Sequence, residues 1–184
     1  MDEIVEAALR KWPNVPHCYG WLGLDTRGEW YLRDVATQAA GPFPSAKGSR
    51  IEHQKLRAFI ERNYAADAEG CWYFQNGPQR VYVELEAAPF VWRLRKSADG
   101  IHVTSHTGHE ARVQSTWIDD DGRLFLVADS AAGLVHSLDM ELAGDEVEAG
   151  RWRPRAVPFT ELPARFGYCL SPATLRSSSP PAPG

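Results

Sequence analysis

Hydrophobic positions recur at helical spacing in two parts of the chain. Near the start, Val5, Leu9 and Trp12 stand at i, i+4 and i+7 and predict a short helix that ends before Pro13. A second apolar stripe, at 56, 59, 60 and 64, follows the tetrapeptide 49–52, which has the pattern of a capping box. The second stripe therefore predicts a helix whose cap is Ser49.

Elsewhere the apolar positions alternate with polar ones, as in strands with one buried face. In residues 81–86, apolar side chains alternate with Tyr82, Glu84 and Glu86, which are expected on the exposed face. Similar patterns predict a hairpin over 19–32 and strands over 90–94, 101–105, 110–118 and 124–128.

A short turn pattern occurs three times, each time with an aspartate three residues before a glycine and bulky β-formers behind it. The three copies begin at Asp25, Asp67 and Asp119. Aspartate accepts backbone hydrogen bonds in turns and glycine tolerates positive φ, so each copy predicts a hairpin. The repetition predicts hairpin units that share one interior.

Together these patterns predict an α+β fold, with two main helices on a twisted, mostly antiparallel sheet of repeated hairpins. Residues 1–170 are expected to form one compact unit, with a subdomain boundary near 65 as an alternative. The stretches 33–48 and 144–158 show no period and are interpreted as irregular. Residues 171–184, rich in Ser and Pro, are expected to be a disordered tail.

Composition narrows the function classes. The net charge is −4 and basic residues are dispersed, which argues against a general nucleic-acid binder. The apolar runs are too short for a membrane span, and acidic residues stand where a signal peptide needs basic ones, so a cytoplasmic location is expected. The three cysteines are widely spaced and are interpreted as reduced thiols. We find no nucleophile-elbow, zincin, dinucleotide or CxxC motif, and we expect no cofactor.

One candidate ligand site precedes the second predicted helix. Lys47, Ser49 and Arg50 stand where backbone amides and the helix dipole favour a phosphate or carboxylate, and His53 follows in the first turn. The alternative is that these basic side chains are simply solvated. Prolines 42 and 44 and the missing glycine before the lysine argue against a nucleotide cradle.

A second candidate is a shallow polar and aromatic pocket. Gln79 and Arg80 would stand at its mouth, and Trp92 would be one of its walls, which would suit a small ligand or an extended peptide. The alternative is that most of the tryptophans belong to the core.

Two other clusters have structural alternatives that we favour. His102, His106 and His109 could bind zinc only if they converge, and we interpret them as exposed hairpin histidines, so no metal site is predicted. The aspartates of the three turns could ligate calcium, but turn formation explains them without an ion. Glu84 and Glu86 could act as an acid–base pair, or lie on a solvated strand face.

Several short motifs resemble a known family. They include Pro16-His-Cys18-Tyr-Gly20, Ile51-x-His53-x-x-Leu56, Trp72-Tyr73 and the stretch from Gly77 to Phe90, with a weaker echo at 161–165. This succession resembles the bacterial domain-of-unknown-function family number 1285, over residues 13–170. The resemblance implies a fold of repeated α/β motifs, no established enzymatic activity and a suggested role in signal transduction.

Two functional hypotheses follow. The first is a non-catalytic binding or regulatory protein that recognises a small anionic ligand or a protein partner. The second is a hydrolase with an unfamiliar site, for which His53, Glu84 and Glu86 are the first candidates. An exposed sheet edge also leaves a homodimer open.

Overall fold

The computed structural model describes residues 1–129 and 131–178. The chain has the predicted α+β fold, but its strands form two mixed sheets rather than one. They belong to two compact units. The first comprises Met1–Asp25, Glu29–Glu86 and the chain from Tyr168 onward, and the second comprises Thr26–Gly28 and Ala87–Gly167. The main division of the chain falls after Glu86. The sequence pattern predicted one unit over 1–170, with a subdomain boundary near 65 as an alternative.

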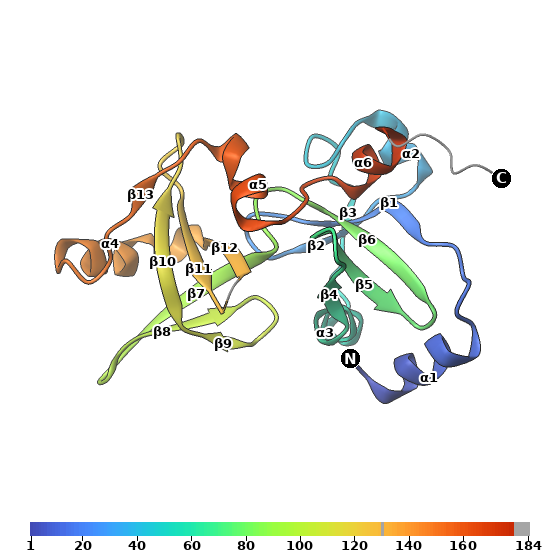
Figure 1. Cartoon of the computed structure of the whole chain (residues 1–184), viewed down its shortest axis with the longest axis horizontal. Helices are drawn as coiled ribbons and strands as arrows, with labels where there is room; N and C mark the ends of the chain where they lie inside the picture. The colour runs from blue at the N-terminus through green and yellow to red at the C-terminus, as the bar shows by residue number, and fades with distance from the viewer. Residues whose placement is uncertain (130, 179–184) are drawn as a thin grey trace. The chain divides into compact units, whose positions relative to one another are not determined.

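The first unit contains a six-stranded sheet in the order β3-β2-β1-β6-β5-β4 (Figure 1). Its strands are β1 (Cys18–Leu24), β2 (Trp30–Leu32), β3 (Ser49–Arg50), β4 (Tyr64–Ala66), β5 (Trp72–Asn76) and β6 (Gln79–Leu85). The central pair, β1 and β6, is parallel, and the other neighbours are antiparallel.

Four helices belong to this unit: α1 (Glu3–Lys11), α2 (Val35–Ala40), α3 (Gln54–Arg62) and α6 (Pro172–Ser178). The predicted loop over 33–48 was wrong in part, because α2 begins there with Asp34 as its N-cap. The capping box was also wrong: the N-cap of α3 is His53, and Ser49 lies in β3, paired with Leu32. The predicted tail contains α6, and residues 179–184 of it lie outside the described residues.

The C-terminal segment completes the first unit. The Leu85 amide donates to the Leu170 carbonyl at 2.8 Å, and Cys169 packs with Cys71 in a small buried cluster. Glu84 is only 4% exposed, and its carboxylate accepts a hydrogen bond from the Ala173 amide at the start of α6. The expectation that Glu84 lies on a solvated strand face was therefore wrong.

The second unit contains a seven-stranded sheet in the order β13-β10-β11-β12-β7-β8-β9. Its strands are β7 (Phe90–Ser97), β8 (Gly100–Ser105), β9 (Glu110–Ala111), β10 (Val113–Ile118), β11 (Leu124–Ala128), β12 (Ala131–Val135) and β13 (Arg155–Ala156). Its helical segments are η1 (Ser137–Asp139), α4 (Met140–Glu148), η2 (Phe159–Glu161) and α5 (Leu162–Phe166). Neither β12 nor α4 was predicted from the sequence, and α4 occupies part of the stretch that was interpreted as irregular.

The two sheets share one strand order. In the first unit, the meanders β1-β2-β3 and β4-β5-β6 meet through the parallel pair β1 and β6. In the second, β7-β8-β9 and β10-β11-β12 meet through the parallel pair β12 and β7. The strand β13 is an addition beside β10.

The three aspartate–glycine turns have the same backbone geometry. In each, the backbone amide of Asp25, Asp67 or Asp119 donates to the carbonyl four residues later, and its carboxylate accepts from the amide of that same residue. The glycine of each turn has positive φ, between 74° and 78°. These carboxylates therefore serve the turns, as the sequence interpretation held.

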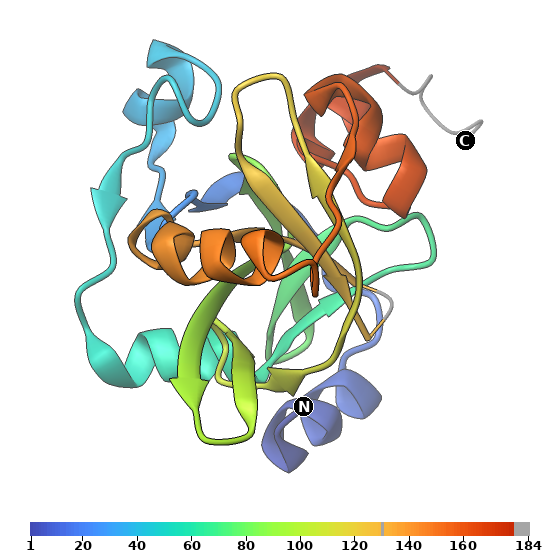
Figure 2. The ribbon, with the colours of Figure 1, turned by 90° about the vertical axis from the view of Figure 1, so that its left-hand side faces the viewer.

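The core of the second unit lies between its sheet and α4. The cluster combines Trp92, Leu94, Val103, Leu126 and neighbouring apolar side chains, and Ala143 of α4 packs against it. In Figure 2, α4 (orange) lies in front of the sheet of this unit, and it contacts β7. Where β12 ends, the Leu94 amide donates to the carboxylate of Asp139 at 3.0 Å, and Arg93 donates to it twice, at 2.6 and 3.2 Å. One buried carboxylate thus joins β7 to the start of α4.

No helix in the described part of the chain has the length and apolar character that a membrane crossing requires.

Candidate functional site

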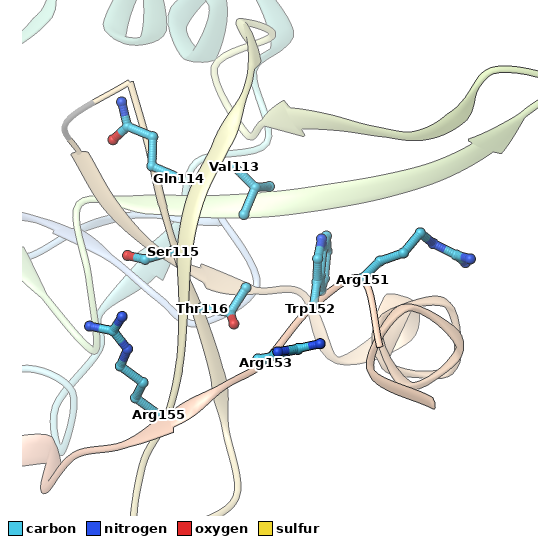
Figure 3. Close-up of a pocket in the computed structure, with 8 residues that line it drawn as sticks. All are labelled: Val113, Gln114, Ser115, Thr116, Arg151, Trp152, Arg153 and Arg155. Carbon is cyan, nitrogen blue, oxygen red and sulfur yellow. The ribbon is translucent and has the colours of Figure 1, made fainter. Parts of the chain in front are cut away.

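A basic pocket lies in the second unit, beside β10 (Figure 3). Its cavity measures about 250 Å³. Four lining residues are consecutive in β10 and four come from the segment that leads from α4 into β13: Val113, Gln114, Ser115, Thr116, Arg151, Trp152, Arg153 and Arg155. We call this set the arginine pocket.

The end of α4 positions one wall of this pocket. The amides of Arg151 and Trp152 both donate to the Glu146 carbonyl at 3.0 Å, which turns the chain back toward β10. The Arg151 guanidinium donates two hydrogen bonds to the Glu146 carboxylate, at 2.7 and 2.6 Å. These bonds hold the pKa of Glu146 below its ordinary value. The charge of Arg151 is therefore already balanced.

The other two arginines of the pocket have no such balance. Within the described residues, neither Arg153 nor Arg155 forms an ion pair. The Arg155 guanidinium lies 5.5 Å from the ring centre of Trp117, and Arg165 lies 5.1 Å from that same ring. Arg155 is thus oriented by an aromatic face, and its charge remains available to an anion.

Hydroxyl groups lie on the β10 side of the pocket. The indole Nε1 of Trp117 donates to Ser115 Oγ at 2.9 Å, so the hydroxyl proton of Ser115 can be donated elsewhere. Thr116 adds a second hydroxyl. Two unbalanced guanidinium groups and two hydroxyls are donors that suit a carboxylate or a phosphate.

The structure places the predicted anion site differently from the sequence interpretation. Lys47 makes ion pairs with Asp25 at 3.2 Å and Glu86 at 2.8 Å. Arg50 lies exposed in β3 and contacts Glu52 at 3.1 Å. The premise of this site was that a helix begins at Ser49. It was wrong, and an anion role for Lys47, Ser49 and Arg50 stays a prediction without that support.

His53, which was expected to assist that site, has a structural role instead. It stands at the N-cap of α3, where its Nδ1 accepts from the Leu56 amide at 3.2 Å. A ligand at this nitrogen would have to displace the cap.

The second predicted ligand set is divided between the two units. Gln79 donates to the Pro16 carbonyl at 2.9 Å, and the Arg80 guanidinium lies 4.4 Å from the Tyr73 ring centre. Trp92 belongs to the second unit, is 2% exposed and donates its indole proton to the Leu126 carbonyl. Trp92 thus has the core position that was the alternative, and ligand binding by Gln79 and Arg80 stays a prediction.

The carboxylates of the hydrolase hypothesis make separate contacts. Burial raises the pKa of Glu84, and its partners lie in the C-terminal segment. Glu86 pairs with Lys47. A raised carboxyl pKa is common at catalytic sites, but here the burial by α6 explains it.

The three candidate zinc ligands His102, His106 and His109 belong to the second unit, and their local settings differ. His106 Nδ1 accepts from the Val91 amide at 3.3 Å, and His109 Nδ1 lies 3.0 Å from the Thr107 hydroxyl. Among the described residues, Asp67, Glu69 and Cys71 lie close together in a turn. Each offers one atom that could ligate a metal ion, and these atoms all lie within 4.8 Å of one another. Because Asp67 already accepts from two turn amides and from Tyr82, this group has a structural explanation.

Sequence reasoning missed the residues of the arginine pocket. The signal was present as Arg151-Trp-Arg-Pro-Arg155, in which three guanidinium groups and an indole fall within one short segment. The stretch lacks a period, which favours an irregular segment, although loops on a rigid scaffold are common places for binding residues.

Comparison with known proteins places the chain in a family. The family model DUF2944, described as "Protein of unknown function (DUF2946)", matches residues 1–173. The chain belongs to this family. No curated protein matches the chain.

Two solved structures resemble this member of the DUF2944 family. A DUF1285 family protein from Silicibacter pomeroyi DSS-3 has a TM-score of 0.50 at 14% identity, over 79% of this chain and 84% of that one. A DUF1285 family protein from Shewanella baltica OS155 has a TM-score of 0.47 at 12% identity, over 68% of this chain and 91% of that one. The first match shows a shared fold, which confirms the resemblance expected from the sequence.

Proposed function

We propose that this DUF2944 protein is a non-catalytic binding or regulatory protein that recognises an anionic group in the arginine pocket. The observation that supports this proposal is the pair Arg153 and Arg155, which face an open cavity of about 250 Å³ without a carboxylate partner in the described residues. Guanidinium groups match the geometry of carboxylates and phosphates, and a ligand would supply the missing negative charge.

The lining of the pocket favours binding over catalysis. It contains three arginines, a tryptophan, a valine, an amide and two hydroxyls, and none of its eight residues is a carboxylic acid, a histidine or a cysteine. General acid–base catalysis needs a group that titrates near the working pH, and a serine or threonine nucleophile needs an adjacent base. This lining offers donors that would hold an anion and no group that would transform it.

A regulatory role agrees with the signalling suggestion carried by the DUF1285 resemblance. In such a role, occupancy of the pocket would be the signal. We place this activity in the bacterial cytoplasm. The matching strand orders of the two sheets lead us to infer that the units are structural repeats of one six-stranded arrangement.

The test is thermal unfolding of the full chain in a series of inorganic phosphate and succinate concentrations at constant ionic strength. A ligand at ten times its Kd raises the free energy of unfolding by about 1.4 kcal/mol. We expect Arg153→Gln and Arg155→Gln to abolish most of this gain. Arg95→Gln is the matched control, because Arg95 is an exposed arginine of the same unit outside the pocket.

Equal stabilisation of all four proteins would mean that the anions act on the whole surface, and the proposal would fail. No stabilisation of the parent by either anion or by an acidic peptide would also exclude it.

A further inference from the structure

A second group of basic side chains lies in the first unit, on three segments that are far apart in the sequence. His17 precedes β1, Arg80 belongs to β6 and Arg176 belongs to α6. The His17 ring meets the Tyr82 ring edge-on, with 5.9 Å between the ring centres. Burial lowers the pKa of His17, and the positive charges of Arg80 and Arg176 lower it further. Both guanidinium groups therefore act on the same imidazole.

Tyrosine rings orient the two guanidinium groups. The Arg176 guanidinium lies 4.7 Å from the ring centre of Tyr19. Tyr19 in turn stacks on Tyr82, with 4.6 Å between the ring centres and 8° between the planes. The Arg80 guanidinium lies 4.4 Å from the ring centre of Tyr73, which packs edge-on against Tyr82 at 5.7 Å. Because an aromatic face attracts a guanidinium without neutralising it, both arginines keep their full charge.

The charges of these two arginines are not balanced by ion pairs. Within the described residues, neither Arg80 nor Arg176 forms one. The charge of Asp67 acts on Arg80, but the Asp67 carboxylate accepts from the Tyr82 hydroxyl at 2.9 Å and from two amides of its own turn. A guanidinium has five N–H donors, so the polar contact between Arg80 and the Tyr82 hydroxyl leaves other donors for a ligand.

We propose that His17, Arg80 and Arg176 form a second anion site, in the first unit, which binds a phosphomonoester dianion. A phosphate group has three terminal oxygens that point in different directions, which suits donors that come from three separate segments. Its two negative charges match the two unbalanced guanidinium groups. A carboxylate has two coplanar oxygens and a single charge, so it would leave one guanidinium unbalanced. This site is independent of the arginine pocket, which belongs to the second unit.

The C-terminal helix contributes one side of this site. Arg176 reaches it because α6 contacts β1 and β6, and because the Glu84 carboxylate accepts from the Ala173 amide at the start of that helix. A phosphate bound by both Arg176 and Arg80 would add a connection between α6 and β6. Since a ligand stabilises the state to which it binds, occupancy would hold α6 in its packed position.

The experiment is an NMR titration of the full chain with methyl phosphate at constant ionic strength and pH of about 7.5, where this ester is a dianion. The imidazole signals are followed, and His17→Asn identifies the signal of His17. We expect methyl phosphate to shift this signal and to raise the pKa of His17, because the bound anion offsets the positive charges of Arg80 and Arg176. Methyl sulfate is the matched control ligand, with a similar shape and one negative charge, and should bind at least about threefold more weakly.

Three variants test the assigned donors. Arg176→Gln and Arg80→Gln should each weaken methyl phosphate binding by about tenfold. Arg176 is exposed, so its substitution leaves the buried packing intact even if Arg80→Gln disturbs the contact with Tyr82. The matched control variant is Arg10→Gln, because Arg10 is an exposed arginine of α1 in the same unit, and it should weaken binding by less than about twofold.

The outcomes decide this inference without reference to the arginine pocket. A His17 signal that methyl phosphate does not move, or equal binding of methyl sulfate, would overturn it. It would also be overturned if Arg10→Gln weakened binding as much as Arg176→Gln. Amide hydrogen exchange in α6 should slow on binding, and unchanged exchange would exclude the connection through Arg176. Thermal unfolding of Arg176→Gln in phosphate then reports on the arginine pocket alone, so the two proposals fail separately.

Discussion

The carboxylate of Asp139 offers the sharpest test of what stabilises the second unit. It is 7% exposed and satisfies the Leu94 amide at a point of β7 that β12 does not reach. Substitution Asp139→Ala removes this acceptor and leaves the buried amide unsatisfied, which costs about 1–3 kcal/mol. Loss of the ion pair with Arg93 adds about 0.5–1 kcal/mol, because the Arg93 side chain is 51% exposed and solvent screens it.

The expected loss is therefore about 1.5–4 kcal/mol, which corresponds to a fall of about 0.8–2 M in the urea midpoint. Urea unfolding followed by tryptophan fluorescence measures it. Arg93→Gln should cost about 1 kcal/mol or less, because the Leu94 amide keeps its acceptor. An Asp139→Ala protein within about 0.5 kcal/mol of the parent would refute the assigned role of this carboxylate.

The same interaction predicts a pH dependence. Burial alone would raise the pKa of Asp139, but the hydrogen bonds from Arg93 and the Leu94 amide outweigh it and hold the pKa below the ordinary value of 3.8. A lowered carboxyl pKa contributes stability above the unfolded pKa and loses it as the pH falls toward the folded pKa. The stability gap between the parent and Asp139→Asn should therefore narrow below pH of about 4. A gap that stays constant down to pH of about 2 would contradict this electrostatic account.

Three further predictions concern other parts of the molecule. Gly133→Ala should destabilise the second unit by about 2 kcal/mol or more in urea unfolding, because the added Cβ would lie 2.8 Å from Phe90 Cβ in the centre of the sheet. An unchanged urea midpoint would contradict this packing. A disulfide reagent at pH of about 8 should modify the half-buried Cys18 first and Cys169 only on unfolding, because burial raises the pKa of Cys169 to about 12. Equal rates of modification of the two thiols in the folded protein would exclude this order. Glu84→Gln should gain stability relative to the parent as the pH rises from about 4 to 7. Burial raises the pKa of Glu84, so ionisation destabilises the folded parent, whereas glutamine does not titrate. A stability difference that does not depend on pH would show that burial does not raise the pKa of Glu84.

Local sequence patterns predicted the elements whose signal is contained within a few residues. The aspartate–glycine turns and the apolar stripe of α3 are examples, because turn hydrogen bonds and helical packing are decided by near neighbours. The start of α3 was predicted wrongly because both Ser49 and His53 can cap a helix. The pairing of Ser49 with Leu32 decided between them, and that pairing is not visible in a local window.

The remaining differences come from contacts between distant residues. Glu84 reads as the exposed position of an alternating strand, and it is buried by a helix that begins 88 residues later. Strand β12 carries small residues because Gly133 lies against Phe90 and the Trp92 indole. The arginine pocket was missed for a related reason: its basic segment becomes a site only when β10 is placed beside it.

The route of the chain through the two units has a consequence for protein synthesis. Because the first unit needs the Leu170 carbonyl for its Leu85 amide and α6 for Glu84, its last pieces leave the ribosome after residues 87–167. The later-encoded unit can thus finish folding while the earlier one still waits for its closing segment. Nascent chains that stop shortly before residue 168 should therefore expose the unfinished sheet of the first unit to chaperones, although every strand of that sheet has already been made.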